Sequence, residues 1–136
     1  MPLKSQVSVE YMLIMGFVAL MIVPLIILYY TYITNSNDEI ISSQVNQLAK
    51  GIVDSAESVY FLGEPSQTTL RIYIPNRIIG ASLDNKEVVF NVSTKSGISQ
   101  IVQVSSIDLM GKLPIGQGVY SLTLNATNAG VKISYK

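Results

Sequence analysis

The chain has 136 residues, with nine basic and nine acidic side chains and no His, Cys or Trp. The absence of His and Cys excludes Ser-His and Cys-His catalysis, imidazole and thiolate metal sites, and disulfide bonds. The basic residues are scattered singly, so the sequence offers no basic patch for nucleic acid. We therefore expect no catalytic residue, no metal site and no cofactor, in a chain with room for one membrane segment and one small domain.

The N-terminal part consists of a short basic leader and a long apolar run. The leader, residues 1–5, contains Lys4, and the run from Tyr11 to Ile33 carries no charge. As a helix these 23 residues span roughly 35 Å, enough to cross the hydrocarbon core of a bilayer. The run is too long for an ordinary secretory signal, and no A-x-A cleavage pattern follows it. Lys4 predicts a cytoplasmic N-terminus, which suits a plain single-pass anchor as well.

Six residues join the leader to the apolar run, Gln6-Val-Ser8-Val-Glu10-Tyr11. This hexapeptide resembles the Q-x-S-x-E-Y start of archaeal type IV pilin-like proteins with class III signal peptides. The resemblance implies that a membrane-bound prepilin-type leader peptidase cuts between Ser5 and Gln6 on the cytoplasmic side. The apolar segment then stays on the mature protein. Ser5 departs from the family, in which Gly or Ala is common before the cut, but it is also small.

The same resemblance implies a function. The chain would be a pilin, the structural subunit of an archaeal type IV pilus-like extracellular filament that serves adhesion. Its precursor would span the membrane once and would join a filament at the cell surface after cleavage. The implied partners are the leader peptidase, an assembly ATPase with its membrane platform, and many copies of the chain itself. The alternative is a single-pass anchor whose extracellular β domain binds a ligand or an envelope partner.

Two residues of the apolar helix are candidates for particular roles. By the same resemblance Glu10 becomes the fifth mature residue, and its carboxylate would neutralise the new α-amino group of Gln6, on the same or an adjacent subunit, in a water-poor filament core. In a plain anchor, Glu10 would only favour the first helical turn. Pro24 lacks the N–H that would bond to the carbonyl of Leu20, so it predicts a kink or a locally weakened helix.

A second helical segment is expected after the apolar run. Tyr29, Tyr30 and Tyr32 are typical of an aromatic belt at the outer interface. Unless Asn35–Asn37 interrupts it, the helix continues to about Phe61 and spans roughly 80 Å in all. Its apolar stripe is expected to pack on the sheet that follows, and comprises Ile41, Val45, Leu48, Ile52 and Val59, beside Ala49, Val53, Ala56 and Tyr60.

The helix is expected to end at Gly63 and Pro65. The resemblance to pilin-like proteins extends to the segment Leu62-Gly-Glu-Pro-Ser66 and to the strand after it.

The remainder of the chain has the two-residue period of β-strands. Apolar residues alternate with polar ones in residues 70–74, 88–92, 120–124 and 131–135, and Ile78–Leu83 and Ile98–Ser105 are further candidates. Turn signals separate these segments, which gives five or six short antiparallel strands. A sheet domain this small is marginal alone, so we expect the helix stripe to complete its core.

We therefore predict an α+β fold, with one long N-terminal helix and a small antiparallel β-sheet head packed on its second half. The predicted parts are the cleaved leader (1–5), the transmembrane or filament-core helix (6–34), its amphipathic continuation (35–62) and the extracellular β domain (66–136).

Few polar residues of the predicted sheet suggest chemistry. Two N-glycosylation sequons occur, Asn91-Val-Ser93 and Asn125-Ala-Thr127. Both asparagines alternate with the residues of their strands that are expected in the core, so Asn91 and Asn125 are candidate N-glycosylation sites. In the sequence, Asp84, Glu87 and Asp108 are too scattered to argue for a hydrolytic pair or a metal cage. Gly116-Gln-Gly118 leads into a strand, which predicts a turn rather than a phosphate cradle.

Overall fold

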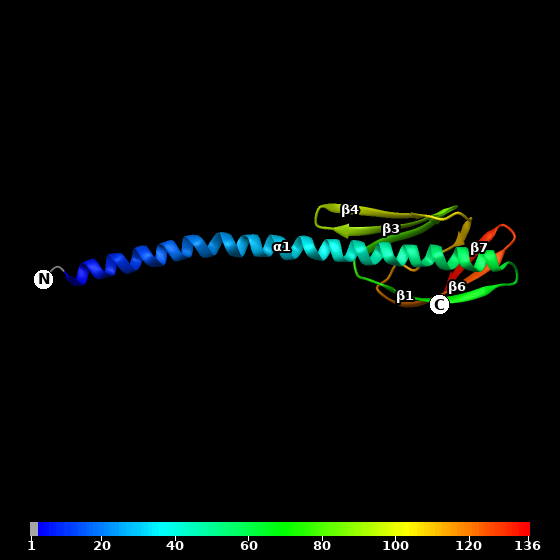
Figure 1. Cartoon of the computed structure of the whole chain (residues 1–136), viewed down its shortest axis with the longest axis horizontal. Coiled ribbons are helices and arrows are strands. Elements are labelled where there is room, and N and C mark those ends of the chain that lie inside the picture. The colour runs from blue at the N-terminus through cyan, green and yellow to red at the C-terminus, as the bar shows by residue number, and fades with distance from the viewer. Residues whose placement is uncertain (1–2) are drawn as a thin grey trace. The chain divides into compact units, whose positions relative to one another are not determined.

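The computed structural model describes the backbone of residues 3–136 and the side chains of residues 8–33 and 37–136. The chain divides into two compact units, residues 1–37 and 38–136, and we call the latter the head unit. Within the described residues the elements are α1 (Leu3–Leu62), β1 (Gln67–Ile74), β2 (Ile78–Asp84), β3 (Glu87–Thr94), β4 (Gly97–Val104), β5 (Leu109–Gly111), β6 (Gly118–Thr127) and β7 (Gly130–Tyr135) (Figure 1).

The helix α1 begins at Leu3, three residues before the predicted start at residue 6. It passes through Pro24 and ends at Leu62, where the predicted amphipathic continuation ends. Gly63 terminates it with a φ of 79°, a left-handed conformation that glycine adopts without strain. The amide of Gly63 donates to the carbonyl of Tyr60 at 3.0 Å, which satisfies one of the last carbonyls of the helix.

The head unit contains two sheets. One has the strand order β1-β6-β7-β5 and the other has the order β2-β3-β4. The neighbouring strands are antiparallel except for β5 and β7, which are parallel. The predicted α+β fold is confirmed, with a long helix and an antiparallel-rich β region packed against its second half.

The strand β5 is the element that the sequence pattern missed. It has only three residues, too few for a two-residue period to be recognised. Its place beside β7 depends on two glycines with positive φ, Gly111 at 129° and Gly130 at 147°. A Cβ at Gly111 would overlap the carbonyl of Ile133, and one at Gly130 would overlap that of Asp108. Backbone therefore approaches backbone at this edge of the sheet.

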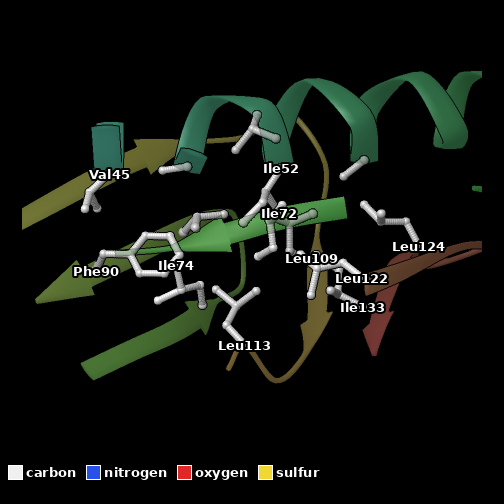
Figure 2. Close-up of a cluster of buried hydrophobic side chains, with 14 of the residues drawn as sticks. Val45, Ile52, Ile72, Ile74, Phe90, Leu109, Leu113, Leu122, Leu124 and Ile133 are labelled. Atoms are coloured by element: carbon white, nitrogen blue, oxygen red, sulfur yellow. The ribbon is translucent and has the colours of Figure 1, made fainter. Parts of the chain in front are cut away.

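The helix stripe and both sheets share one hydrophobic core (Figure 2). Val45, Ala49, Ile52 and Ala56 are fully buried, and their spacing of four, three and four residues keeps them on one helix face. The strands supply Ile74, Phe90, Val92, Leu122, Leu124 and Ile133, among others. The prediction that the helix completes the core of the small sheet domain is therefore confirmed.

Candidate functional site

The apolar surface of α1 is the main candidate site of the first unit. Each residue from 8 to 33 is exposed. Ile26, Ile27 and Leu28 are 49%, 60% and 65% exposed although they follow one another, so apolar side chains point to all sides of the helix. Burying one such side chain is worth about 1.5–3 kcal/mol relative to leaving it in water. This surface therefore requires lipid or other apolar helices around it.

The length of this segment fits a membrane. Within the described residues, the chain has one helix long and apolar enough to cross a bilayer, and it lies near the N-terminus. The coarse prediction of a long apolar N-terminal helix is therefore confirmed, and such a helix is compatible with a membrane anchor.

The residues of the Q-x-S-x-E-Y motif lie at the start of α1. The backbone of Ser5 and Gln6 belongs to α1, and the side chains of both residues lie outside the described ones. Ser8, Glu10 and Tyr11 are exposed. Pairing between the α-amino group of Gln6 and the carboxylate of Glu10 stays a prediction, as does cleavage between Ser5 and Gln6.

Pro24 and the tyrosines mark the second half of the apolar segment. Pro24 lies inside α1, where it provides no N–H for the carbonyl one turn earlier. Tyr29 and Tyr30 contact each other edge to face, with ring centroids 6.4 Å apart, and Tyr32 is 73% exposed. Exposed tyrosines at the end of an apolar run fit the polar interface of a membrane.

Both sequons lie within strands of the head unit. Asn91 is in β3 and Asn125 is in β6. Each is half-buried, and the residues directly before and after it in its strand are buried. The Asn91 side chain lies against Gly80 of β2, where an added Cβ would be 3.2 Å from the Asn91 Nδ2. Glycosylation of either residue stays a prediction.

The acidic residues of the head are closer in space than in sequence. Asp84, Glu87 and Asp108 line one shallow surface hollow together with Lys86. Among the described residues, no group of three acidic, His or Cys side chains is arranged to hold a metal ion. The segment Gly116–Gly118 leads from a loop into β6, as the predicted turn requires.

Two carboxylates of α1 bind backbone amides next to β4, and the sequence pattern assigned neither this role. Asp38 accepts from the amide of Lys95 at 3.1 Å and forms an ion pair with Arg77. Glu57 accepts from the amide and the hydroxyl of Ser106, each at 2.8 Å. These contacts fix α1 to the two ends of β4.

The same hydrogen bonds shift the pKa of both carboxyl groups. The Ser106 amide and hydroxyl lower the pKa of Glu57 below its ordinary value. The Lys95 amide is the largest cause of the lowered pKa of Asp38, and the Arg77 guanidinium contributes further. In both cases a donor stabilises the charged carboxylate more than the neutral acid.

Asn46 of α1 makes a third contact on this side. Its Oδ1 accepts a hydrogen bond from Nε2 of Gln103 in β4 at 2.6 Å. Side chains of α1 thus contact β4 itself, close to its C-terminal end, as well as the residues that flank the strand.

Comparison of the chain with protein-family models, curated proteins and solved structures finds no match.

Proposed function

We propose that the chain is a pilin, the structural subunit of a type IV pilus-like extracellular filament. It is made as a membrane-inserted precursor with a cytoplasmic N-terminus and is assembled after cleavage between Ser5 and Gln6. The observation that carries the proposal is the apolar helical surface of residues 12–33, exposed on every side, directly after the Gln6–Tyr11 motif.

The exposed surface favours a protein that exchanges one apolar environment for another. Lipid tails cover the segment in the precursor, and apolar helices of neighbouring copies cover it in a filament. Because burial is conserved in this exchange, assembly costs no hydrophobic free energy. The partners in this scheme are the leader peptidase, an assembly ATPase with its membrane platform, and the chain itself. The filament serves adhesion at the cell surface.

Glu10 supports the proposal because it is the one carboxylate among residues 8–33. A buried carboxylate requires a charged or hydrogen-bonding partner. Cleavage before Gln6 creates an α-amino group four residues before Glu10, and the same chain or a neighbouring copy can supply this amine as the partner. A helix with no purpose other than anchoring needs no acid at this position.

The second candidate is a single-pass anchor that presents the head unit outside the cell to a ligand or envelope partner. The cluster of Tyr29, Tyr30 and Tyr32 favours it, since tyrosines at the end of an apolar run suit a helix that stays in a bilayer.

Intact-mass analysis combined with shearing separates the two functions. Cells that make the native protein are sheared, and the released material and the membranes are analysed by mass spectrometry. A pilin starts at Gln6 and is enriched in the sheared fraction. A chain that starts at Met1 or Pro2 and remains with the membranes contradicts the proposal and favours the anchor.

A further inference from the structure

One edge of β1 has no strand partner within residues 38–136, because β1 is the first strand in the order β1-β6-β7-β5. The amide of Ala126 in β6 donates to the carbonyl of Ser66 at 2.9 Å. Along an antiparallel strand, the backbone N–H and C=O groups of successive residues point alternately to opposite sides. Because the carbonyl of Ser66 bonds to β6, the backbone groups of the even-numbered residues of β1 also point toward β6. The N–H and C=O groups of Thr69, Arg71 and Tyr73 therefore point away from the sheet.

A groove lies beside this edge, between α1 and β1. Leu48 and Gly51 line it on the helix side, and Leu70 and Arg71 line it on the strand side. A second hollow continues along the same two elements as far as Leu62 and Gln67. Gly51 has no side chain, and a Cβ at this position would meet no atom within 4 Å, so the space beside the helix is open here.

The other side of α1 is closed. There the side chains of Asp38, Asn46 and Glu57 bind β4 and its flanking amides. Figure 1 shows β4 and β1 on opposite sides of this half of α1. The helix is thus bonded on its β4 side by these side chains, and on its other side the free edge of β1 lies beside an open groove.

Arg71 adds a charge to the open side. Arg71 is exposed, and its side chain has no hydrogen bond or ion pair within the described part of the chain. Arg77, by contrast, is paired with Asp38. Arg71 is therefore a free cation beside the unpaired backbone groups.

We propose that the groove binds an extended peptide that adds a strand to the free edge of β1. The peptide's backbone bonds to the outward groups of Thr69, Arg71 and Tyr73, and its acidic residue lies across the strand pair from Arg71. The two peptide residues that flank the acidic residue point their side chains toward Leu48 and Leu70, so apolar residues suit these two positions of the peptide. This inference is independent of the filament, because only the head unit takes part.

The test uses the full chain in detergent micelles and an acetylated, amidated probe peptide of sequence Thr-Val-Glu-Val-Thr. A control peptide carries Lys in place of Glu. Peptide binding is expected to slow amide hydrogen exchange at Thr69, Arg71 and Tyr73. Leu70 and Ile72 already donate within the sheet and are expected to change little. A lack of binding, or slowed exchange elsewhere only, would overturn the proposal.

Two variants sharpen the test. Thr69→Pro removes an outward N–H of the free edge of β1 and leaves the bonds to β6 intact, so affinity is expected to fall about tenfold. Thr69→Val is the matched control because it keeps the N–H, and it is expected to bind as the native chain does. Equal affinity of folded Thr69→Pro and Thr69→Val would show that the edge does not bind the peptide backbone.

A charge exchange tests the site even where Thr69→Pro fails to fold. Arg71→Glu is expected to reverse the preference, so that the Lys peptide binds more tightly than the Glu peptide. An unchanged preference would refute the role of Arg71 and the proposed site. Neither result changes the N-terminal mass or the sheared fraction, so this proposal and the filament fail separately.

Discussion

The two halves of α1 both carry many apolar residues, more in the first half than in the second, and their surroundings differ. Between residues 8 and 33 each side chain is exposed, whereas in the head unit Val45, Ala49, Ile52 and Ala56 are fully buried. The difference is in how the apolar residues are distributed. In the second half they form one stripe, and polar residues fill the remaining faces. In the first half they occupy all faces, so no single sheet can cover them.

Only the second half of α1 is covered by other apolar residues of the same chain within the described residues. The stripe packs against strands of the same chain and contributes to the stability of the head unit. The apolar run has no such cover within the described residues, and its length and composition are compatible with a membrane anchor. Substitutions in the two halves are therefore expected to affect different measurements, namely assembly for the first half and unfolding of the head for the second.

The largest effect is expected from Glu10→Ala in the first half. In a filament core this change leaves the Gln6 amine without its counter-charge, at a cost of about 3–5 kcal/mol per broken pair. We predict that the precursor inserts and is stable in the membrane but yields few or no filaments. Yield is measured by quantifying the sheared surface fraction against the native chain.

Cleavage must be verified in this variant, because a leader peptidase that requires Glu10 would also prevent assembly. A Glu10→Ala protein that starts at Gln6 and still forms filaments at normal yield would show that the charge pairing is dispensable. Glu10 would then only favour the start of the helix.

The next effect compares one isoleucine in each half. Ile52→Ala removes buried methyl groups from the core, so we expect the free energy of unfolding of the head to fall by about 2–5 kcal/mol. Ile26→Ala is the matched control, because Ile26 is 49% exposed and lies outside the head unit. We expect it to change head stability by less than about 0.5 kcal/mol. Urea titration in micelles, followed by near-ultraviolet circular dichroism, measures both.

If both isoleucine variants unfold at the native urea concentration, Ile52 does not contribute to the core as described. Equal destabilisation by both would mean that the stability of the head depends on the apolar run.

Much of the fold is readable from periodicity. The helix stripe, the end of α1 at Gly63 and the strands with clear alternation follow from spacings of three to four and of two residues. Ile78–Leu83 and Ile98–Ser105 also correspond to strands, β2 and β4. Local periodicity records which face is buried, and both kinds of element bury one face.

What the sequence did not predict depends on contacts between distant residues. The parallel pairing of β5 requires Gly111 and Gly130 to admit a neighbouring backbone, and a short strand has no period. The binding of Lys95 by Asp38 joins residues 57 positions apart. The groove beside β1 is lined by residues of α1 and of β1 that lie about 20 positions apart in the chain, such as Gly51 and Leu70. None of these features has a local signature.

Glu57 provides the next prediction, which concerns these unforeseen contacts. Glu57→Gln keeps an acceptor but loses the charge that the Ser106 amide and hydroxyl stabilise. We expect a loss of about 1 kcal/mol of head stability near neutral pH. Asp54→Asn is the control, since Asp54 lies on the exposed face of α1.

The pH dependence of this loss follows from the lowered pKa of Glu57. Its stabilising contribution is complete above the ordinary value of 4.5 and disappears as the pH falls through the lower folded pKa. The native chain and Glu57→Gln should therefore become equally stable in acid. Unfolding curves at several pH values measure this, and a difference that persists below the folded pKa would contradict the assignment.

The smallest effect is expected from Asp38→Asn, because the Asp38 ion pair lies near the surface. Asn still accepts the hydrogen bond from the Lys95 amide, so only the attraction to the Arg77 guanidinium and the charge-assisted part of the bond are lost. The lowered pKa of Asp38 means that its contribution is present above the ordinary value of 3.8 and is lost as the pH falls through the folded value.

Added salt screens the ion pair between Asp38 and Arg77, so the difference in melting temperature between the native chain and Asp38→Asn should shrink as ionic strength rises. Glu39→Gln, a change at the exposed neighbouring residue, is the control for the loss of one negative charge. A melting temperature for Asp38→Asn equal to that of Glu39→Gln at low salt would mean that the contacts of Asp38 with Lys95 and Arg77 do not stabilise the head.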